Sequence, residues 1–271
     1  NMSKKLVKST GTVAGMTMVS RVLGFVRDVV LAASFGASPA FDAFVIAFKI
    51  PNFFRRLFAE GAFAQAFVPI LTEYKMQQSE TMVQQFINRV AGTLAVSLLA
   101  VVIVAEIFVP LLVLVFAPGF VHHPMRYELA KHMLYVTFPY LLLISMAAFG
   151  GAVLNAWQRF AIPALTPVML NVAMISAAFI GVSYFEQPIY VLAWGVIGGG
   201  VLQCGMQFYA LYQQGLLPRF QLGFGDSHVR RVLKKMVPAL FGVSVAQLGL
   251  LIDSFFASFL PAGSISWLYY S

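Results

Sequence analysis

Charged side chains are scarce in this sequence. Asp, Glu, Lys and Arg make up 10% of its 271 residues, whereas about 25% is usual in soluble domains. Apolar types account for 60% of the residues, and the mean hydropathy is +0.83. A water-soluble fold of this size could not cover so much apolar surface, but a bilayer removes the need to cover it. The composition therefore predicts a membrane protein.

Cysteine and catalytic signatures are also nearly absent. The one cysteine, Cys204, lies in an apolar run, which excludes a disulfide framework. The sequence contains no phosphate-binding glycine loop, hydrolase triad motif, zinc-binding HExxH or dinucleotide fingerprint. We therefore expect no enzyme and no bound cofactor. We also expect no nucleic-acid partner despite the net charge of +8, because the basic residues fall in short loops between apolar runs.

Long apolar runs predict an all-α, polytopic protein. A transmembrane helix needs about 20 mainly apolar residues, and an eighth run begins near Ser264 and stops with the chain. The first seven predicted spans are 11–34, 42–72, 86–117, 130–156, 161–184, 188–214 and 236–260. Proline removes a backbone donor and can kink a helix. The candidate kinks are Pro51, Pro110, Pro139 and Pro167.

The basic residues between the spans predict the orientation. If the N-terminus is cytoplasmic, only Arg126 and Lys131 fall in outer segments. The basic residues that then fall on the cytoplasmic side are Lys4, Lys5, Lys8, Lys75, Arg89, Arg159, Arg219, Arg230, Arg231, Lys234 and Lys235. Cytoplasmic loops are usually the basic ones, so we expect a cytoplasmic N-terminus.

Charged residues interrupt the first two predicted spans. They are Arg21, Arg27, Asp28, Asp42, Lys49, Arg55, Arg56 and Glu60. A charge at the bilayer centre costs about 2.5–3.5 kcal/mol even on lenient scales. These side chains are therefore expected to face a watery cavity or one another.

Helical spacing leaves two interpretations of these charges open. Seven-residue spacing places Arg21 and Asp28 on one helix face, and Glu60 follows Arg56 by four residues, so both pairs are candidate structural ion pairs. However, five cations stand against three anions. A surplus of buried cations favours an anionic ligand, and the planar fork of arginine suits phosphate or carboxylate.

The same segments carry a recognisable pattern. Residues 20–28 read SRVLGFVRD, residues 48–63 read FKIPNFFRRLFAEGAF, and residues 65–69 read QAFVP. Later stretches include TFPY at 137–140 and FASFL at 256–260. This pattern closely resembles the MurJ (MviN) family of bacterial lipid II flippases, which belongs to the MOP exporter superfamily.

The resemblance implies a MOP-type fold of two six-span lobes that alternate in access. Residues 1–215 would form the N-terminal lobe, 216–235 a basic cytoplasmic linker, and 236–271 the start of the second lobe. Arg21, Arg27 and Arg55 would hold the pyrophosphate and sugar region of the substrate. The residues implied in transport or gating are Asp28, Asp42, Lys49, Arg56, Glu60 and Ser266.

The resemblance also implies the function. The protein would move lipid II, the lipid-linked peptidoglycan precursor, across the bacterial inner membrane, as a monomer among membrane lipids. One alternative is another MOP-type transporter, either a polysaccharide-lipid flippase or a cation-coupled drug exporter. A second alternative is a membrane scaffold whose charges only join helices.

Asp253 stands alone in the seventh predicted span. A lone intramembrane carboxylate can carry Na⁺ or a proton, and some members of the resembled family bind sodium at the matching position. The competing interpretation is an ion pair with a basic residue of another span. A third interpretation is a side chain that faces water or the edge of the lipid. The coupling cation, Na⁺ or H⁺ with Asp253 as its candidate ligand, is thus one of three interpretations that the sequence leaves open.

Overall fold

The structure is a computed structural model that describes the backbone of residues 2–271 and the side chains of residues 7–181 and 183–271. The side chains of Lys4 and Lys5, which were counted for the orientation, lie outside the described residues. Residues 2–271 form helices and connecting loops, with no strand. The predicted all-α class is therefore confirmed.

Eleven α-helices, one π-helical segment (η1) and one 3₁₀ segment (η2) follow one another along residues 2–271. Their bounds are α1 Met2–Phe35, α2 Pro39–Arg55, η1 Arg56–Phe63, α3 Ala64–Gln77, α4 Glu80–Ile107, α5 Val109–Phe116, η2 Pro118–His122, α6 Pro124–Thr137, α7 Tyr140–Ala156, α8 Ala161–Tyr184, α9 Ile189–Gln213, α10 Ser227–Ala257 and α11 Ser264–Tyr270.

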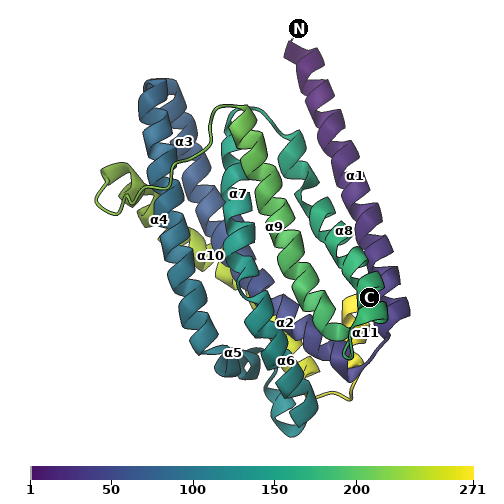
Figure 1. The fold of residues 1–271 in the computed structure, drawn as a ribbon. Helices are drawn as coiled ribbons and strands as arrows, with labels where there is room; N and C mark the ends of the chain where they lie inside the picture. Colours follow the sequence, from purple (N-terminus) through teal and green to yellow (C-terminus); the bar gives the residue numbers. More distant parts are fainter. Residues whose placement is uncertain (1) are drawn as a thin grey trace.

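Five helices of the described chain are long and apolar enough to cross a membrane. They are Glu80–Ile107, Pro124–Ala156, Ala161–Gly181, Ile189–Gln213 and Ser227–Ala257. The two predicted spans that carry the charged residues, in α1 and in α2 to α3, are not among these five. Figure 1 shows α7, α9, α8 and α1 side by side, with α9 packed between α7 and α8 and α1 against α8.

The connections with basic residues gather at one end of the molecule. The α3–α4, α7–α8 and α9–α10 connections lie at the end where the N-terminus is found, and the α1–α2 and α5–α6 connections lie at the opposite end (Figure 1). Lys75 of α3 donates a hydrogen bond to the carbonyl of Ala156 at 2.9 Å. The ends of α3 and α7 are therefore in direct contact.

Segments α2, η1 and α3 form one continuous helix whose winding changes along its length. Ser38 caps its start by accepting from the backbone N–H of Phe41 at 3.2 Å, and Pro51 lies inside α2 without ending it. Residues Arg56–Phe63 wind as a π-helix before α3 resumes the α-helical pitch. In a π-helix each N–H bonds five residues back, so side chains five apart come to share a face.

Several predicted boundaries differ from the helix ends, and two of these differences have a local cause. The run 86–117 is split at Phe108, where φ −102° and ψ 16° end α4, and Pro110 stands in the first turn of α5. Helix α10 begins at Ser227 rather than at 236, because Asp226 caps it by accepting from the backbone N–H groups of His228 and Val229. The second half of segment 216–235 is thus helical.

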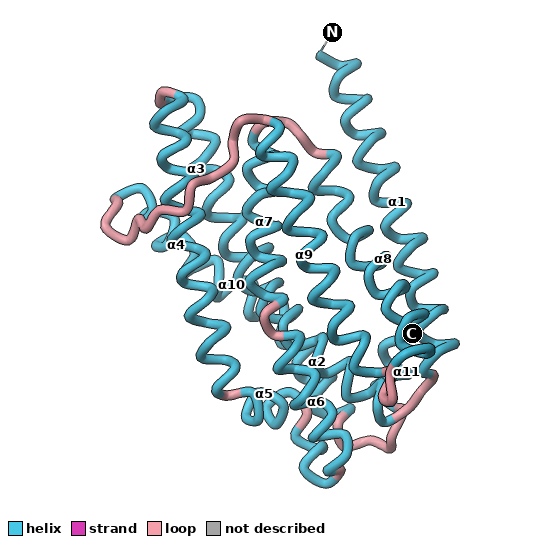
Figure 2. Tube along the Cα trace, viewed as in Figure 1, coloured by secondary structure: helices cyan, strands magenta, loops and turns pink. Residues whose placement is uncertain are grey.

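The loop between α9 and α10 is bound to α4. Figure 2 shows it as the longest connection, crossing over α4. The side chain of Asn88 accepts from the backbone N–H of Arg219 at 2.8 Å, and Thr93 accepts from that of Gly223 at 2.9 Å. Gly92 lets this loop approach, since a Cβ there would overlap the backbone of Gln221. These contacts fix the start of α10 beside α4.

Candidate functional site

Four of the eight charged residues of the first two predicted spans line one cavity of about 500 Å³. Its walls come from α1, α2, η1, α10 and α11, with one residue each from α5 and α8. The polar lining residues are Arg27, Lys49, Asn52, Arg55, Arg56, Asp253, Ser254 and Tyr269. Segments more than 200 residues apart in sequence therefore meet around four basic side chains.

The guanidinium of Arg27 is held from two sides. Its Nε and Nη2 donate to Oδ1 of Asp28 at 2.9 and 2.8 Å, and its Nη1 donates to Oδ1 of Asn171 on α8 at 3.0 Å. The hydroxyl of Tyr269 donates to the same Asp28 oxygen at 3.3 Å. Arg27 is thus oriented before any ligand arrives.

Arg55 is held in a similar way. Its Nε donates to Oδ1 of Asn52 at 3.1 Å, and its Nη1 forms an ion pair with Glu60. The predicted pair of Arg56 and Glu60 is wrong because η1 winds as a π-helix, which brings Glu60 under the residue five positions before it.

The predicted pair of Arg21 and Asp28 is also wrong. Seven residues of α-helix separate the two Cα atoms by about 10 Å along the axis, so the neighbouring Arg27 takes the carboxylate instead. The side chain of Arg21 is exposed and is not among the residues that line the cavity.

Three of the five span cations therefore form no ion pair within the described residues. They are Arg21, Lys49 and Arg56. Lys49 and Asp253 attract each other across the cavity without coming into ion-pair contact. In the described part of the chain, no group of three or more His, Cys, Asp or Glu side chains is placed to hold a metal ion.

A second cavity of about 550 Å³ shares Arg27, Asn52 and Arg55 with the first. It is lined by uncharged polar side chains that the sequence analysis missed. Gln203, which is buried, accepts from the hydroxyl of Tyr140 at 3.0 Å and donates to the carbonyl of Thr166 at 2.9 Å. The available signal was the placement of Asn171, Gln203 and Gln207 within apolar runs.

Asp42 forms a separate buried cluster of hydrogen bonds with Gly263, Ser266 and Arg126, at the end of the molecule opposite the N-terminus. We call this cluster the Asp42 joint. The side chain of Asp42 is 0% exposed. One carboxylate oxygen accepts from the N–H of Ser266 at 2.8 Å and from its hydroxyl at 2.5 Å, and the other accepts from the N–H of Gly263 at 2.6 Å. Asp42 of α2 thus satisfies N–H groups at the start of α11 that have no partner within that helix.

Arg126 completes this joint. The sequence analysis placed it in an outer segment, but it lies on α6 with 2% of its surface exposed. It pairs with Asp42 at 3.4 Å and stacks over the ring of Phe120. Since Asp42 and Arg126 lie in the first half of the chain and Gly263 and Ser266 near its end, these bonds connect α2 and α6 to α11.

Together, the fold and the cavity define a class: a multi-pass α-helical membrane protein whose helices surround a charged cavity. A family model described as "Lipid II flippase MurJ" matches residues 31–271. The chain belongs to this family, and it spans about half the length of the curated relatives it matches.

Individual relatives agree with this assignment. A "Probable lipid II flippase MurJ" of Vibrio cholerae is 46% identical over 277 residues, covering 100% of this chain and 53% of the relative. The "Lipid II flippase MurJ" of Burkholderia cenocepacia is 42% identical over 98% of this chain and 52% of its own length. A solved "Lipid II flippase MurJ, inward closed conformation" matches with TM-score 0.78 and 31% identity, over 95% of this chain and 53% of that one.

Proposed function

We propose that the full-length protein is a flippase that moves lipid II from the inner to the outer leaflet of the bacterial inner membrane. Family membership supports this proposal, because the relatives bear that name. The observation that carries it is the pair of pre-oriented guanidinium groups, Arg27 and Arg55, in one cavity together with Lys49 and Arg56.

The chemistry of the cavity suits a pyrophosphate. Arg27 and Arg55 are each held by a carboxylate and an amide, so little side-chain freedom is lost when they meet an anion. Lys49 and Arg56 add positive charge that is not neutralised by an ion pair. Arg21, which lies outside the cavity lining, would contact the substrate only on its way in or out.

The Asp42 joint would act as the gate at the outer end. The basic connections at the N-terminal end favour a cytoplasmic N-terminus, which places the joint toward the outer leaflet. While it is formed, Ser266 and Gly263 stay bound to α2. Alternating access would require these bonds to break while the cavity opens outward, with Asp28 and Glu60 re-pairing as Arg27 and Arg55 release the substrate.

Substitution of the cavity arginines tests the proposal. Arg27→Ala and Arg55→Ala each remove a charge-assisted contact worth about 1.5–3 kcal/mol, so lipid II binding to the purified full-length protein should weaken by about 10- to 100-fold. Growth should fail in a strain depleted of its own flippase. The matched control is Arg219→Ala, a basic loop residue outside the cavity, which should bind and grow normally.

The alternatives predict different outcomes. Variants that insert, accumulate and still support growth would refute the cavity mechanism. Variants that accumulate normally but fail to bind and grow would exclude a scaffold, since a scaffold needs only the folded protein. Drug efflux without lipid II binding would identify another MOP-type transporter.

A further inference from the structure

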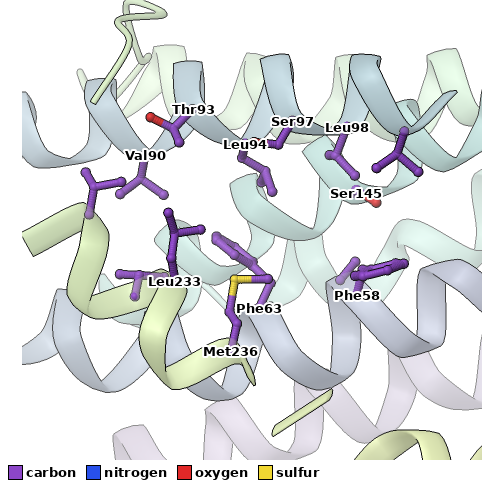
Figure 3. A pocket seen from close by; sticks show the side chains of 14 residues that line it. Phe58, Phe63, Val90, Thr93, Leu94, Ser97, Leu98, Ser145, Leu233 and Met236 are labelled. Atoms are coloured by element: carbon purple, nitrogen blue, oxygen red, sulfur yellow. The ribbon is translucent and has the colours of Figure 1, made fainter. Parts of the chain in front are cut away.

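A second kind of cavity lies behind the π-helical segment. It is a slot of about 200 Å³ between α4, η1, α7 and α10, separate from the two charged cavities and almost wholly apolar in its lining. Figure 3 shows Leu94 of α4 across the slot from Leu233 and Met236 of α10 and Phe63 of η1, and Leu98 of α4 across from Phe58 of η1.

The slot is elongated along α4. Its lining positions on that helix run from Val90 to Val101 at the spacing of one helical face, which corresponds to about 16 Å along the axis. An apolar cavity of about 150 Å³ in a protein core stays dry and accepts small apolar molecules such as benzene. The slot is larger, at about 200 Å³. Its length of about 16 Å along α4 suits an extended segment of a hydrocarbon chain.

The slot reaches the surface of the described chain between α4 and α10. Val101 and Leu233 line it and are each 37% exposed, and Val96 and Leu99, on the adjoining outer face of α4, are exposed as well. Both α4 and α10 are among the helices apolar enough to cross the membrane. At the depth of two such helices the surrounding solvent is hydrocarbon. The occupant that can reach the slot is therefore a lipid chain.

We propose that this slot binds the hydrocarbon chain of a bilayer lipid, wedged between α4, the π-helical segment and α10. The proposal goes beyond the transport function and does not depend on the transported substrate. One wall is shared with the site, since Ala59 lines both the slot and the cavity that contains Arg55 and Glu60. A chain that binds this arrangement stabilises it against any arrangement in which α10 moves away from α4.

Photo-labelling of the full-length protein tests this proposal. The probe is a phosphatidylcholine with a diazirine in the middle of one acyl chain, in phosphatidylcholine vesicles, and the labelled residues are mapped by mass spectrometry. We expect labelling at Leu94, Leu98 and Met236 in addition to the outer positions Val96 and Leu99. Labelling confined to the outer positions would overturn the proposal.

A filling substitution with a neighbouring control makes the test specific. Ser97 lines the slot and Val96 does not. Ser97→Phe should lower labelling of the slot positions at least about five-fold and leave Leu99 unchanged, whereas Val96→Phe should leave both unchanged. Equal slot labelling in the two variants would contradict the assignment. If S97F does not accumulate as monodisperse protein, Ser97→Leu is the smaller filling change.

Ser145 distinguishes a hydrocarbon chain from a polar ligand. Its side chain lines the slot at 2% exposure, and its hydroxyl has no hydrogen-bond partner within the described residues. A hydrocarbon chain offers no acceptor, so Ser145→Ala should keep or increase slot labelling. A fall of more than about three-fold in this variant would show that the occupant bonds to the hydroxyl, and the hydrocarbon assignment would be wrong.

Discussion

The hydroxyl of Ser266 offers the sharpest test of the proposed gate. It donates to Asp42 at 2.5 Å, while the backbone N–H of the same residue donates to the same carboxylate oxygen at 2.8 Å. Ser266→Ala removes the first bond and leaves the second. A hydrogen bond to a charged group contributes about 1.5–3 kcal/mol, so the ratio of closed to open gate should fall by about 10- to 100-fold.

Distance measurements between spin labels on the two sides of the joint report this ratio. Met125 on α6 and Trp267 on α11 are 61% and 69% exposed, so cysteines there can carry labels in a full-length protein whose Cys204 is replaced by serine. Unaltered protein should populate the short distance. Ser266→Ala should move population to longer distances.

A second serine of α11 provides the matched control. The side chain of Ser264 makes no hydrogen bond within the described residues, and it lies two positions from Ser266. Ser264→Ala should therefore leave the distance distribution unchanged. If the two alanine variants behave alike, the Asp42–Ser266 bond does not hold the gate and the reasoning fails.

Two further predictions concern Asp253 and Asp226. If Asp253 binds the coupling cation, the full-length protein should melt at a higher temperature in Na⁺ than in equal K⁺, and Asp253→Asn should abolish the difference; equal melting of the unaltered protein in both salts would exclude a sodium site. Burial raises the pKa of Asp226, but hydrogen bonds from two backbone N–H groups of α10 and from Arg89 outweigh it and lower the pKa. Its stabilising contribution is therefore present above about pH 4, the usual Asp value, and is lost as the pH falls through the lower folded pKa. Asp226→Ala should cost about 0.5–2 kcal/mol at neutral pH as a lost helix cap, with a smaller difference from unaltered protein at pH 3, as measured by thermal melting.

Most of the helices could be predicted because their apolar runs are long and clearly bounded. The predicted span 161–184 coincides with α8, and 188–214 differs from α9 by one residue at each end. The errors arose where a local feature outweighs hydropathy. Asp226 starts α10 early because a capping carboxylate extends a helix into a basic segment, and a sliding count of apolar residues does not register capping.

The charged residues themselves were identified, but their partners were not. The helical period of 3.6 residues, which we assumed for the side-chain positions, does not apply in the π-helix η1. No pattern in this part of the sequence predicts a π-helix. Arg126 reaches Asp42 across 84 residues, and Ser266 reaches it across 224. Such contacts follow from how the helices pack and not from any local spacing. The resemblance to a known family supplied Asp42 and Ser266 as separate residues, and the structure adds that they touch.

Helix α11 links the gate to the anion-holding part of the cavity. Ser266 bonds to Asp42, and three residues later Tyr269 bonds to Asp28, the partner of Arg27. Asp28 lies on α1 and Asp42 on α2, so movement of α11 away from both helices would break the two contacts together. An anion that draws Arg27 away from Asp28 removes the positive charge beside the carboxylate to which Tyr269 donates. The affinity of the protein for the anion therefore differs between the closed and the open gate. By reciprocity, opening the gate changes the affinity for the anion by the same factor, and a flippase needs such coupling to release its substrate on the far side.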